Sequence, residues 1–439
     1  MQKRNVRFAA LGVSAMLLLA CGGGSKNAAS STSSSSSTSS SSSSSTSSDV
    51  AAPQGFLVIK APTGVDPKLF GQNVAATTTK RGAPIVAFAV HDASGDRSTI
   101  EVATYDEVKK AFGAPITVAS GSLYDEKQSI SIALDEASGT EVLTWDDGSK
   151  VIASQSTDDG ASWHTTTVAD GSDQAHSGRT PAIAAKNGKV AIGYIDGNDI
   201  PAIATGDLSS TTFTITEVPN PGDPAVNNTP PAIAAADDGT FAAAYVVSPS
   251  AGGKAVAYLP VGGTTPVLAL DSKGVQNDSP SVGLAFTSKG PLVGATLCRT
   301  ATEAQQDACT WVAASNDGGT TFKEPVAVPP DHSAGGGFVT RIAADSKDHG
   351  AFAYLSNSGT GDNSCGEPKV AISDDLTTWQ TCSPDQDGSL GLAAGVPSLA
   401  VGTDDSLVIA FQQTSTSAKA PVGVLVVLYP PLGSQPAKP

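Results

Sequence analysis

The sequence predicts an all-β protein, a β-propeller of seven four-stranded blades. Three observations support this fold. One strand pattern recurs about every fifty residues, turn-forming residues interrupt the chain every few positions, and no long helical pattern is present. The 439 residues include 45 Gly and 28 Pro, with 15% charged and 5% aromatic residues. That composition excludes a coiled coil, a polytopic membrane protein and a nucleic-acid binder, which needs a basic face.

The repeated strand alternates apolar residues and ends near an aromatic residue. Its seven copies cover 84–90, 141–147, 190–196, 241–247, 291–297, 350–356 and 406–412. The equivalent positions in these copies are Phe88, Trp145, Tyr194, Tyr245, Ala295, Tyr354 and Phe411, and neighbouring positions lie 49 to 59 residues apart. A period of this length, with strand chemistry throughout, is typical of a propeller blade.

The units also contain further strands. In the first three units these are 98–105 and 115–120, 149–155 and 164–169, and 202–205 and 213–218. They are short, rich in β-branched residues and bounded by turn residues, which favours antiparallel strands over helices. Residues 105–112 are the exception, because their composition predicts one or two helical turns in place of a hairpin tip.

The last unit predicts how the ring closes. It offers strands at 397–401, 406–412 and 422–430 but no fourth strand. Residues 56–60 form an unmatched strand ahead of the first unit, so we expect them to complete the last blade as its outer strand. This pairing would remove an exposed edge between the first and last blades. Six blades is the alternative to seven.

A second motif, S-x-D-x-G-x-x-(W/F), lies at hairpin tips. It is chemically suited to a turn, because the Asp accepts backbone N–H groups, the Gly adopts positive φ and the aromatic residue packs beneath. Complete copies contain Ser156, Asp158, Gly160 and Trp163, then Ser315, Asp317, Gly319 and Phe322. Degenerate copies contain Ser373, Asp375 and Trp379, which lack the Gly, and residues 205–213.

This motif, in register with the blade spacing, resembles the Asp-box (bacterial neuraminidase repeat) propellers, the family that includes exo-sialidases. The resemblance covers 56–430 and implies that the boxes lie on the face away from a ligand site. Sialidases hold the substrate carboxylate with three arginines and use a Tyr–Glu nucleophile pair and an Asp acid/base. Seven blades would depart from the six usual in sialidases. A shared fold does not by itself bring the enzyme activity with it.

The residues needed for sialidase chemistry are incomplete in this chain. The opening strand carries Asn73 where the family has its first arginine, and the nearest match, Arg179-Thr-Pro181, opens the third unit. A triad of Arg179, Arg299 and Arg341 is arithmetically possible. Three of the tyrosines, Tyr194, Tyr245 and Tyr354, occupy the repeated aromatic position, which favours core packing over a nucleophile role. No other catalytic motif is present, and we expect no metal or cofactor.

The first fifty-five residues predict export. Lys3, Arg4 and Arg7 precede the apolar segment 8–20, which is too short to anchor a chain and is typical of a signal peptide. Its end, Leu18-Leu19-Ala20-Cys21, resembles the lipobox of bacterial lipoproteins, so we expect a lipidated Cys21 and, from the flanking residues, an outer-membrane location. The Ser-rich tether 21–55 and the tail 431–439 should be disordered. Removal of the three basic residues changes the formal charge from −16 to −19.

Four more cysteines, in an exported chain, predict disulfides. Each neighbouring pair brackets a predicted hairpin, so the expected bridges are Cys298–Cys309 and Cys365–Cys382. Three pairings are formally possible. A zinc site is the alternative, although the C-x-x-C spacing is missing.

Topology predicts where a ligand binds, because loops between second and third strands and between blades gather on the face opposite the boxes. The candidate residues on that face are His91, Asp92, Asp146, His176, Arg179 and Arg299, although for the two histidines we favour surface solvation over a ligand role. The sequence predicts a lipid-anchored binding or scaffolding module for a glycan or protein partner, acting without catalysis and without nucleic acid. The alternatives are an exo-sialidase or related glycoside hydrolase and an assembly factor for an envelope complex.

Overall fold

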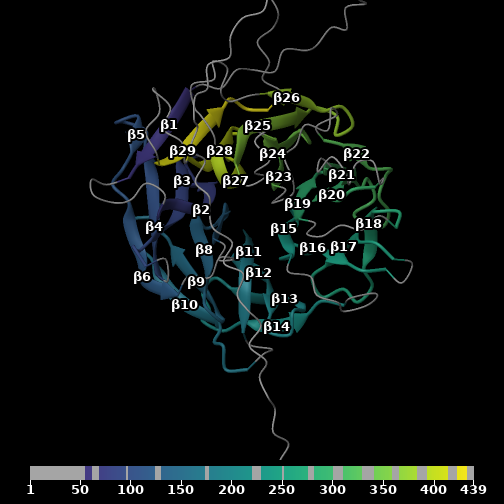
Figure 1. Cartoon of the computed structure of the whole chain (residues 1–439), viewed down its shortest axis with the longest axis horizontal. Coiled ribbons are helices and arrows are strands. Elements are labelled where there is room, and N and C mark those ends of the chain that lie inside the picture. Colours follow the sequence, from purple (N-terminus) through teal and green to yellow (C-terminus); the bar gives the residue numbers. More distant parts are fainter. Residues whose placement is uncertain are drawn as a thin grey trace, which may run out of the picture. The chain divides into compact units, whose positions relative to one another are not determined.

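The computed structural model shows an all-β protein built of seven four-stranded blades, as the sequence predicted (Figure 1). It describes residues 55–61, 69–94, 97–123, 130–173, 177–219, 229–249, 252–274, 281–299, 310–328, 341–357, 365–382, 393–413 and 423–432. These residues contain 29 strands and no α-helix; the strand beyond four per blade is the two-residue β5 (Ala111–Phe112), which pairs with the end of β4 (Arg97–Asp106) in blade 1.

Blades 1 to 4 follow one another along the chain, each an antiparallel sheet whose first strand lies nearest the ring axis (Figure 1). Blade 1 contains β2 (Phe70–Thr78), β3 (Pro84–His91), β4 (Arg97–Asp106), β5 (Ala111–Phe112) and β6 (Ile116–Leu123); blade 2 contains β7 (Ile130–Asp135), β8 (Thr140–Asp147), β9 (Lys150–Ser156) and β10 (His164–Ala169); blade 3 contains β11 (Gly178–Lys186), β12 (Lys189–Asp196), β13 (Pro201–Asp207) and β14 (Thr214–Glu217); blade 4 contains β15 (Ala232–Ala235), β16 (Phe241–Val247), β17 (Ala255–Pro260) and β18 (Val267–Asp271).

Blades 5 to 7 complete the ring, and the first strands of successive blades contact one another all the way round. Blade 5 contains β19 (Val282–Thr287), β20 (Gly290–Thr296), β21 (Thr310–Ala314) and β22 (Val326–Ala327); blade 6 contains β23 (Arg341–Ala344), β24 (Gly350–Asn357), β25 (Cys365–Ser373) and β26 (Gln380–Cys382); blade 7 contains β27 (Ala393–Val401), β28 (Leu407–Gln413), β29 (Gly423–Tyr429) and, from the start of the chain, β1 (Gly55–Lys60).

Closure of the ring follows the prediction. Strand β1 pairs antiparallel with β29, with Phe56 opposite Val427 and Lys60 opposite Gly423. Two side chains add hydrogen bonds between blades 7 and 1. Gln412 Nε2 donates to the Phe70 carbonyl at 3.2 Å, and Ser398 Oγ accepts the Ala76 N–H at 2.8 Å. The two ends of the propeller sequence are therefore joined both by a strand ladder and by buried polar contacts.

The helical expectation for residues 105–112 is wrong. The segment is a hairpin, in which β4 turns through 107–110 into β5 and Tyr105 pairs with Phe112. The Asp106 carboxylate accepts the N–H groups of Val108 and Lys109, each at 3.0 Å, which stabilises a turn in competition with a helix. The Tyr105 and Phe112 rings meet edge to face across the hairpin, with centroids 5.6 Å apart.

One connection between blades was not predicted. The start of β25 pairs with β27 of the next blade, with Cys365 opposite Ala394 and Gly366 opposite Ala393. Blades 6 and 7 are thereby hydrogen-bonded into one eight-stranded sheet.

The repeated aromatic position forms the packed interior between blades. Phe88, Trp145, Tyr194, Tyr245 and Phe411 are each at most 1% exposed, and Tyr354 is 5% exposed. The tyrosines therefore pack in the blade cores, as the repeat predicted. The clusters that contain these rings also contain residues of the neighbouring blade, as Trp145 and Ile85 share one cluster, so the same side chains stabilise the blade and its junction.

Candidate functional site

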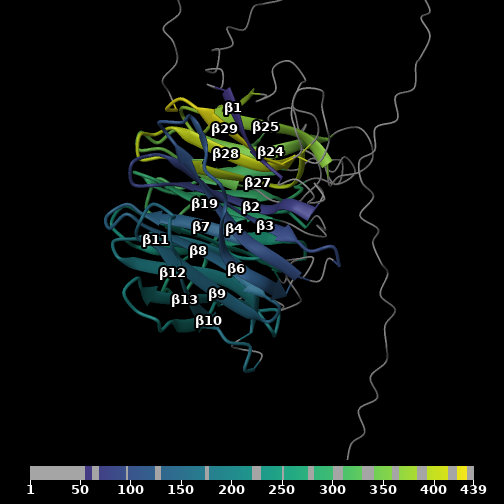
Figure 2. The ribbon, with the colours of Figure 1, turned by 90° about the vertical axis from the view of Figure 1, so that its left-hand side faces the viewer.

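The ring has two different faces because every blade is antiparallel (Figure 2). The hairpin tips that join first to second and third to fourth strands define one face, here called the turn face. The connections between second and third strands and between successive blades define the other, here called the loop face. Arg179 lies near the start of β11 and Arg299 follows β20, so this topology brings these two arginines to the loop face. Arg341 lies opposite Ala353 in β24.

Arg179 lies at the junction of blades 2 and 3 and is held by residues of its own blade. Its guanidinium forms an ion pair with Asp199 and donates to the Asp196 carbonyl at 3.5 Å. The adjacent Thr180 has φ of +53°, an unfavourable conformation for a β-branched residue, and its N–H donates to the buried Asp146 carboxylate at 2.9 Å. The structure therefore brings two of the predicted residues, Asp146 and Arg179, to one inter-blade junction.

Arg299 lies in blade 5 and is also bound by the chain itself. Its Nη2 donates to Glu324 at 2.8 Å, its Nε donates to the Asp271 carbonyl at 3.3 Å, and its guanidinium carbon lies 4.9 Å from the Trp311 ring centroid. The hydrogen bond and charge of Arg299 lower the pKa of the Glu324 carboxyl below its usual range. Trp311 and Glu324 were not predicted as its partners, because the sequence shows neither the cross-strand stack nor the ion pair.

Arg341 differs from the other two arginines. It is partly exposed at the start of β23, the first strand of blade 6. Burial of its guanidinium lowers the pKa of Arg341 to about 10, which leaves the group charged at neutral pH. Within the part of the chain that the structure describes, the Arg341 side chain makes no hydrogen bond or ion pair, and its backbone pairs with Ala353 of β24. The three arginines thus belong to three blades, and two of them already bind carboxylates of the chain.

His91, the histidine candidate that the structure describes, is not a surface group. His91 is 6% exposed, and burial lowers the pKa of its imidazole to about 4, so it is neutral at pH 7. Surface solvation is therefore the wrong explanation for His91. Asp92 is exposed and accepts the N–H and hydroxyl of Ser94 at 3.0 and 2.7 Å. His176 lies outside the described residues.

The S-x-D-x-G tips form the turn that their residue types predicted. In the first copy Asp158 accepts the Ser156 hydroxyl and the Ser162 N–H at 2.9 and 2.8 Å, and Gly160 has φ of +81°. In the second copy Asp317 makes the same contacts with Ser315 and Thr321. These hydrogen bonds lower the pKa of Asp317 to about 2. The degenerate copy keeps the Asp375 contacts, and Leu376 adopts the positive φ that Gly provides elsewhere.

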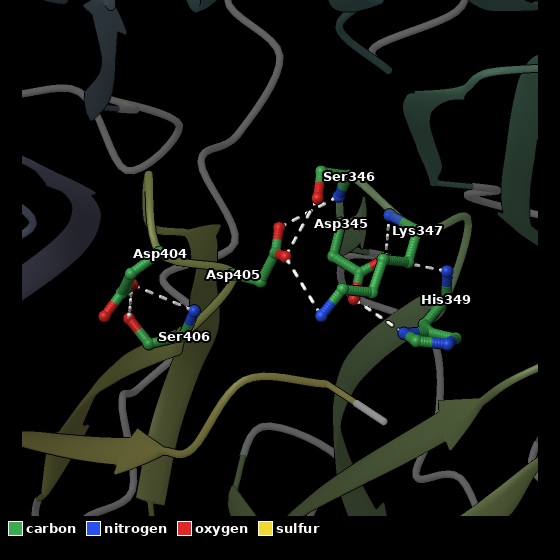
Figure 3. Close-up of polar contacts among 7 residues, drawn as sticks. All are labelled: Asp345, Ser346, Lys347, His349, Asp404, Asp405 and Ser406. Carbon is green, nitrogen blue, oxygen red and sulfur yellow. Dashed lines mark hydrogen bonds and ion pairs between the residues drawn. The ribbon is translucent and has the colours of Figure 1, made fainter. Parts of the chain in front are cut away.

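A set of inter-blade contacts on the turn face was missed from sequence. Between blades 6 and 7, the Ser346 N–H and hydroxyl donate to Asp405 at 3.0 and 2.8 Å, and Lys347 lies 3.6 Å from the same carboxylate (Figure 3). Asp345 holds this turn in shape by accepting the His349 ring nitrogen at 2.7 Å (Figure 3). The Ser288 N–H and hydroxyl contact Asp348 in the same way one blade earlier. The carboxylates of Asp405 and Asp348 therefore connect neighbouring blades.

The pairing of β25 with β26 excludes one of the two predicted disulfides. Cys382 lies opposite Val370, five residues along β25 from Cys365, which separates the two cysteines by about 17 Å of strand. A disulfide needs Cα atoms within about 7 Å, so the pair Cys365–Cys382 is excluded by this pairing. For the other pair, Thr296 lies opposite Thr310 at one end of the ladder between β20 and β21, two residues before Cys298. Because Cys309 lies outside the described residues, Cys298–Cys309 stays a prediction, as does lipidation of Cys21.

No group of three His, Cys, Asp or Glu side chains among the described residues is arranged to hold a metal ion. No helix among them is long and apolar enough to cross a membrane.

Several solved structures are similar to this chain at low identity. The alpha-L-arabinofuranosidase Arb93A from Fusarium graminearum is 10% identical with a TM-score of 0.48, and the match covers 86% of this chain and 98% of that one. The NanB sialidase of Streptococcus pneumoniae (K499G mutant) is 10% identical with a TM-score of 0.47, covering 85% and 70%. A protein of unknown function from Dyadobacter fermentans is 13% identical with a TM-score of 0.46, covering 86% and 98%. At these values the likenesses say nothing about a ligand or a reaction. No protein-family model and no curated protein sequence matches the chain.

Proposed function

We propose that the protein is a lipid-anchored binding module of the cell envelope, which holds a glycan or a protein partner on its loop face without catalysing a reaction. The observation that carries this proposal is the state of the groups a sialidase would need. Arg179 and Arg299, two of the three candidate carboxylate ligands, are bound to carboxylates of the chain. Each would have to break an existing ion pair to bind a substrate carboxylate.

The tyrosines support the same proposal. Tyr194 and Tyr245 are fully buried, and burial raises the pKa of each phenol to well above its usual value of about 10. The Tyr245 hydroxyl donates to the Pro219 carbonyl. A phenol in such a setting loses its proton less readily, the reverse of what an activated nucleophile requires. The loop face, in contrast, presents exposed polar residues such as Asp92, which suit a polar partner.

Parallel assays distinguish binding from catalysis. The purified body, residues 55 to 432, would be incubated with a panel of fluorogenic sialosides and, separately, applied to a glycan array. We expect saturable glycan or protein binding and no turnover. Turnover that is lost in Arg179→Ala and kept in Arg81→Ala would overturn the proposal in favour of a hydrolase. Arg81 is a suitable control because its side chain is 82% exposed and lies on the turn face.

The anchor is tested separately. The full chain and a Cys21→Ser variant would be expressed in a Gram-negative host, and membranes would be separated from soluble periplasm. We expect the wild type in the membrane fraction, with a lipid-modified N-terminal peptide in its mass spectrum, and the variant in the soluble fraction. If the wild type and the variant partition equally between the two fractions, the proposal of a lipid anchor at Cys21 is wrong.

A further inference from the structure

The first strands of the seven blades share one equivalent position near the ring axis. In each blade this residue pairs with the residue immediately before the repeated aromatic position. We call the seven residues the axial ring; they are Ala75, Ser131, Ala182, Ala232, Gly283, Arg341 and Ser398. Six of them are Ala, Ser or Gly. Arg341 is therefore the one charged and the one long side chain of the axial ring.

The two serines show what a side chain at this position contacts. Ser131 Oγ accepts the N–H of Ile183 at 3.3 Å, and Ser398 Oγ accepts the N–H of Ala76 at 2.8 Å. In both cases the donor lies in the first strand of the next blade, one residue after its axial-ring residue. Side chains of the axial ring thus lie over a backbone N–H on the inner edge of the next blade.

Arg341 occupies this position but can only donate hydrogen bonds. In blade 7 the N–H equivalent to those of Ile183 and Ala76 is that of Leu399, one residue after the axial-ring residue Ser398. The Gly402 N–H bonds to the Ser406 carbonyl at 2.7 Å, and counting back along the ladder makes Leu399 and Ile409 a pair without mutual hydrogen bonds. The Leu399 N–H therefore points to the inner edge, away from β28. Blade 6 therefore has an arginine, which is a donor, at the position where blades 2 and 7 have a serine hydroxyl that accepts the N–H of the next blade.

We infer that the Arg341 guanidinium and the inner-edge N–H of Leu399 form an oxyanion-binding site at the junction of blades 6 and 7. A carboxylate, a sulfate and a phosphate share the chemistry that this site would bind, since each offers acceptor oxygens to a planar guanidinium fork. The other members of the axial ring are small and uncharged, so none of them supplies a competing carboxylate.

This site deepens the proposed function and rests on it for its biological role, because it would hold an acidic group of the glycan or protein partner. It does not require the three-arginine arrangement, since Arg179 and Arg299 are engaged elsewhere. A single arginine with one backbone donor predicts modest affinity and a clear dependence on ionic strength.

The test is calorimetric titration of the folded body with sodium sulfate, and in separate arms with phosphate and glucuronate, at constant ionic strength. We expect saturable binding by the wild type and at least a tenfold loss in Arg341→Ser. Serine is the residue that blades 2 and 7 hold at this position, so the variant can restore the inter-blade hydrogen bond and should fold. Arg341→Lys, which keeps the charge but loses the fork, should lie between the two.

Arg81→Ser provides the matched control, because it also removes one arginine, but on the turn face. Its sulfate affinity should stay within twofold of the wild type. Absence of saturable binding in the wild type, or equal affinities in wild type and Arg341→Ser, would overturn the inference. The arm with the tightest binding identifies the class of anion. Because the titrations use small anions, a protein that binds no anion at Arg341 is distinguishable from a protein that binds no glycan on the array.

Discussion

Ser398 Oγ accepts the backbone N–H of Ala76 at 2.8 Å, although the two residues are 322 positions apart in the chain. Ser398 belongs to the first strand of blade 7 and Ala76 to the first strand of blade 1, so this bond lies at the point where the ring closes. Both groups are buried. The inner edge of blade 1 thereby gains an acceptor that its own sheet does not provide.

Replacement of Ser398 should weaken closure. In Ser398→Ala the buried Ala76 N–H loses its acceptor, and an unsatisfied buried donor costs about 1–3 kcal/mol of unfolding free energy. Denaturation by urea measures the change. Ser131→Ala is the matched control, because it removes the same contact at the junction between blades 2 and 3, where the bond is longer at 3.3 Å. A loss in Ser398→Ala no larger than that in Ser131→Ala would contradict a special role in closure.

Neighbouring glycines of the second S-x-D-x-G tip should respond very differently to alanine. Gly319 has φ of +93°, and a Cβ there would lie 2.2 Å from Cε1 of Tyr258. Gly318 has φ of +71° with nothing within 4 Å of a Cβ. We expect Gly319→Ala to destabilise the protein by more than about 2 kcal/mol, since strain and overpacking add, and Gly318→Ala by about 1 kcal/mol. Thermal denaturation of the two variants checks the difference, and equal losses would show that the clash is relieved without cost.

The sequence was sufficient for the blade count because each blade is one period of the chain. Alternation within 190–196 or 241–247 is local, and β12 (Lys189–Asp196) and β16 (Phe241–Val247) follow it closely. The helix predicted for residues 105–112 is absent because the helical composition of this segment competes with the turn at Asp106. The contact between the Tyr105 and Phe112 rings favours the hairpin, but it exists only after the hairpin has formed.

The candidate site was less predictable, because its contacts lie between blades. The sequence places Arg179 and Asp146 on the loop face, but the bond from Asp146 to the Thr180 N–H depends on the rotation of blade 3 against blade 2. No periodic pattern records that rotation. The internal repeat was sufficient to single out Arg341. When the first strands of the seven blades are aligned, this position holds an arginine in blade 6 and a small residue in each of the other six.

The cysteine register predicts a simple disulfide map. Digestion of the unreduced protein after alkylation should yield a peptide linking Cys298 to Cys309, with Cys365 and Cys382 recovered as separately alkylated thiols. The physical reason is the separation of about 17 Å along β25 between Cys365 and the residue opposite Cys382. A linked Cys365–Cys382 peptide would contradict the pairing of β25 with β26. Reduction should loosen the second-to-third strand connection of blade 5 while the ring persists.

Glu141 occupies a position that is apolar in the other blades. Aligned on the repeated aromatic position, its equivalents are Pro84, Val190, Phe241, Pro291, Gly350 and Leu407. Glu141 is fully buried, and no described group forms a well-aligned hydrogen bond with either carboxyl oxygen. The Ser156 hydroxyl donates to Asp158. Burial raises the pKa of Glu141 to about 7. The Glu141 backbone N–H and the Ser156 hydroxyl lower this pKa in part, and the charges of Asp159 and Asp158 raise it.

This raised pKa predicts that stability falls as pH rises. Between the unfolded pKa of 4.5 and the folded pKa of about 7, the unfolded chain has released the Glu141 proton and the folded protein still holds it. Folding is therefore disfavoured increasingly through this window, and the penalty is about 3 kcal/mol above pH 7. Glu141→Val, which installs the blade 3 residue, should remove the penalty, so its gain in unfolding free energy over the wild type should be much larger at pH 8 than at pH 5. Urea denaturation at both pH values measures this, with the exposed Glu136→Gln as control. A gain that is the same at both pH values would mean that Glu141 is ionised in the folded protein at pH 5, and that an unrecognised partner stabilises its charge.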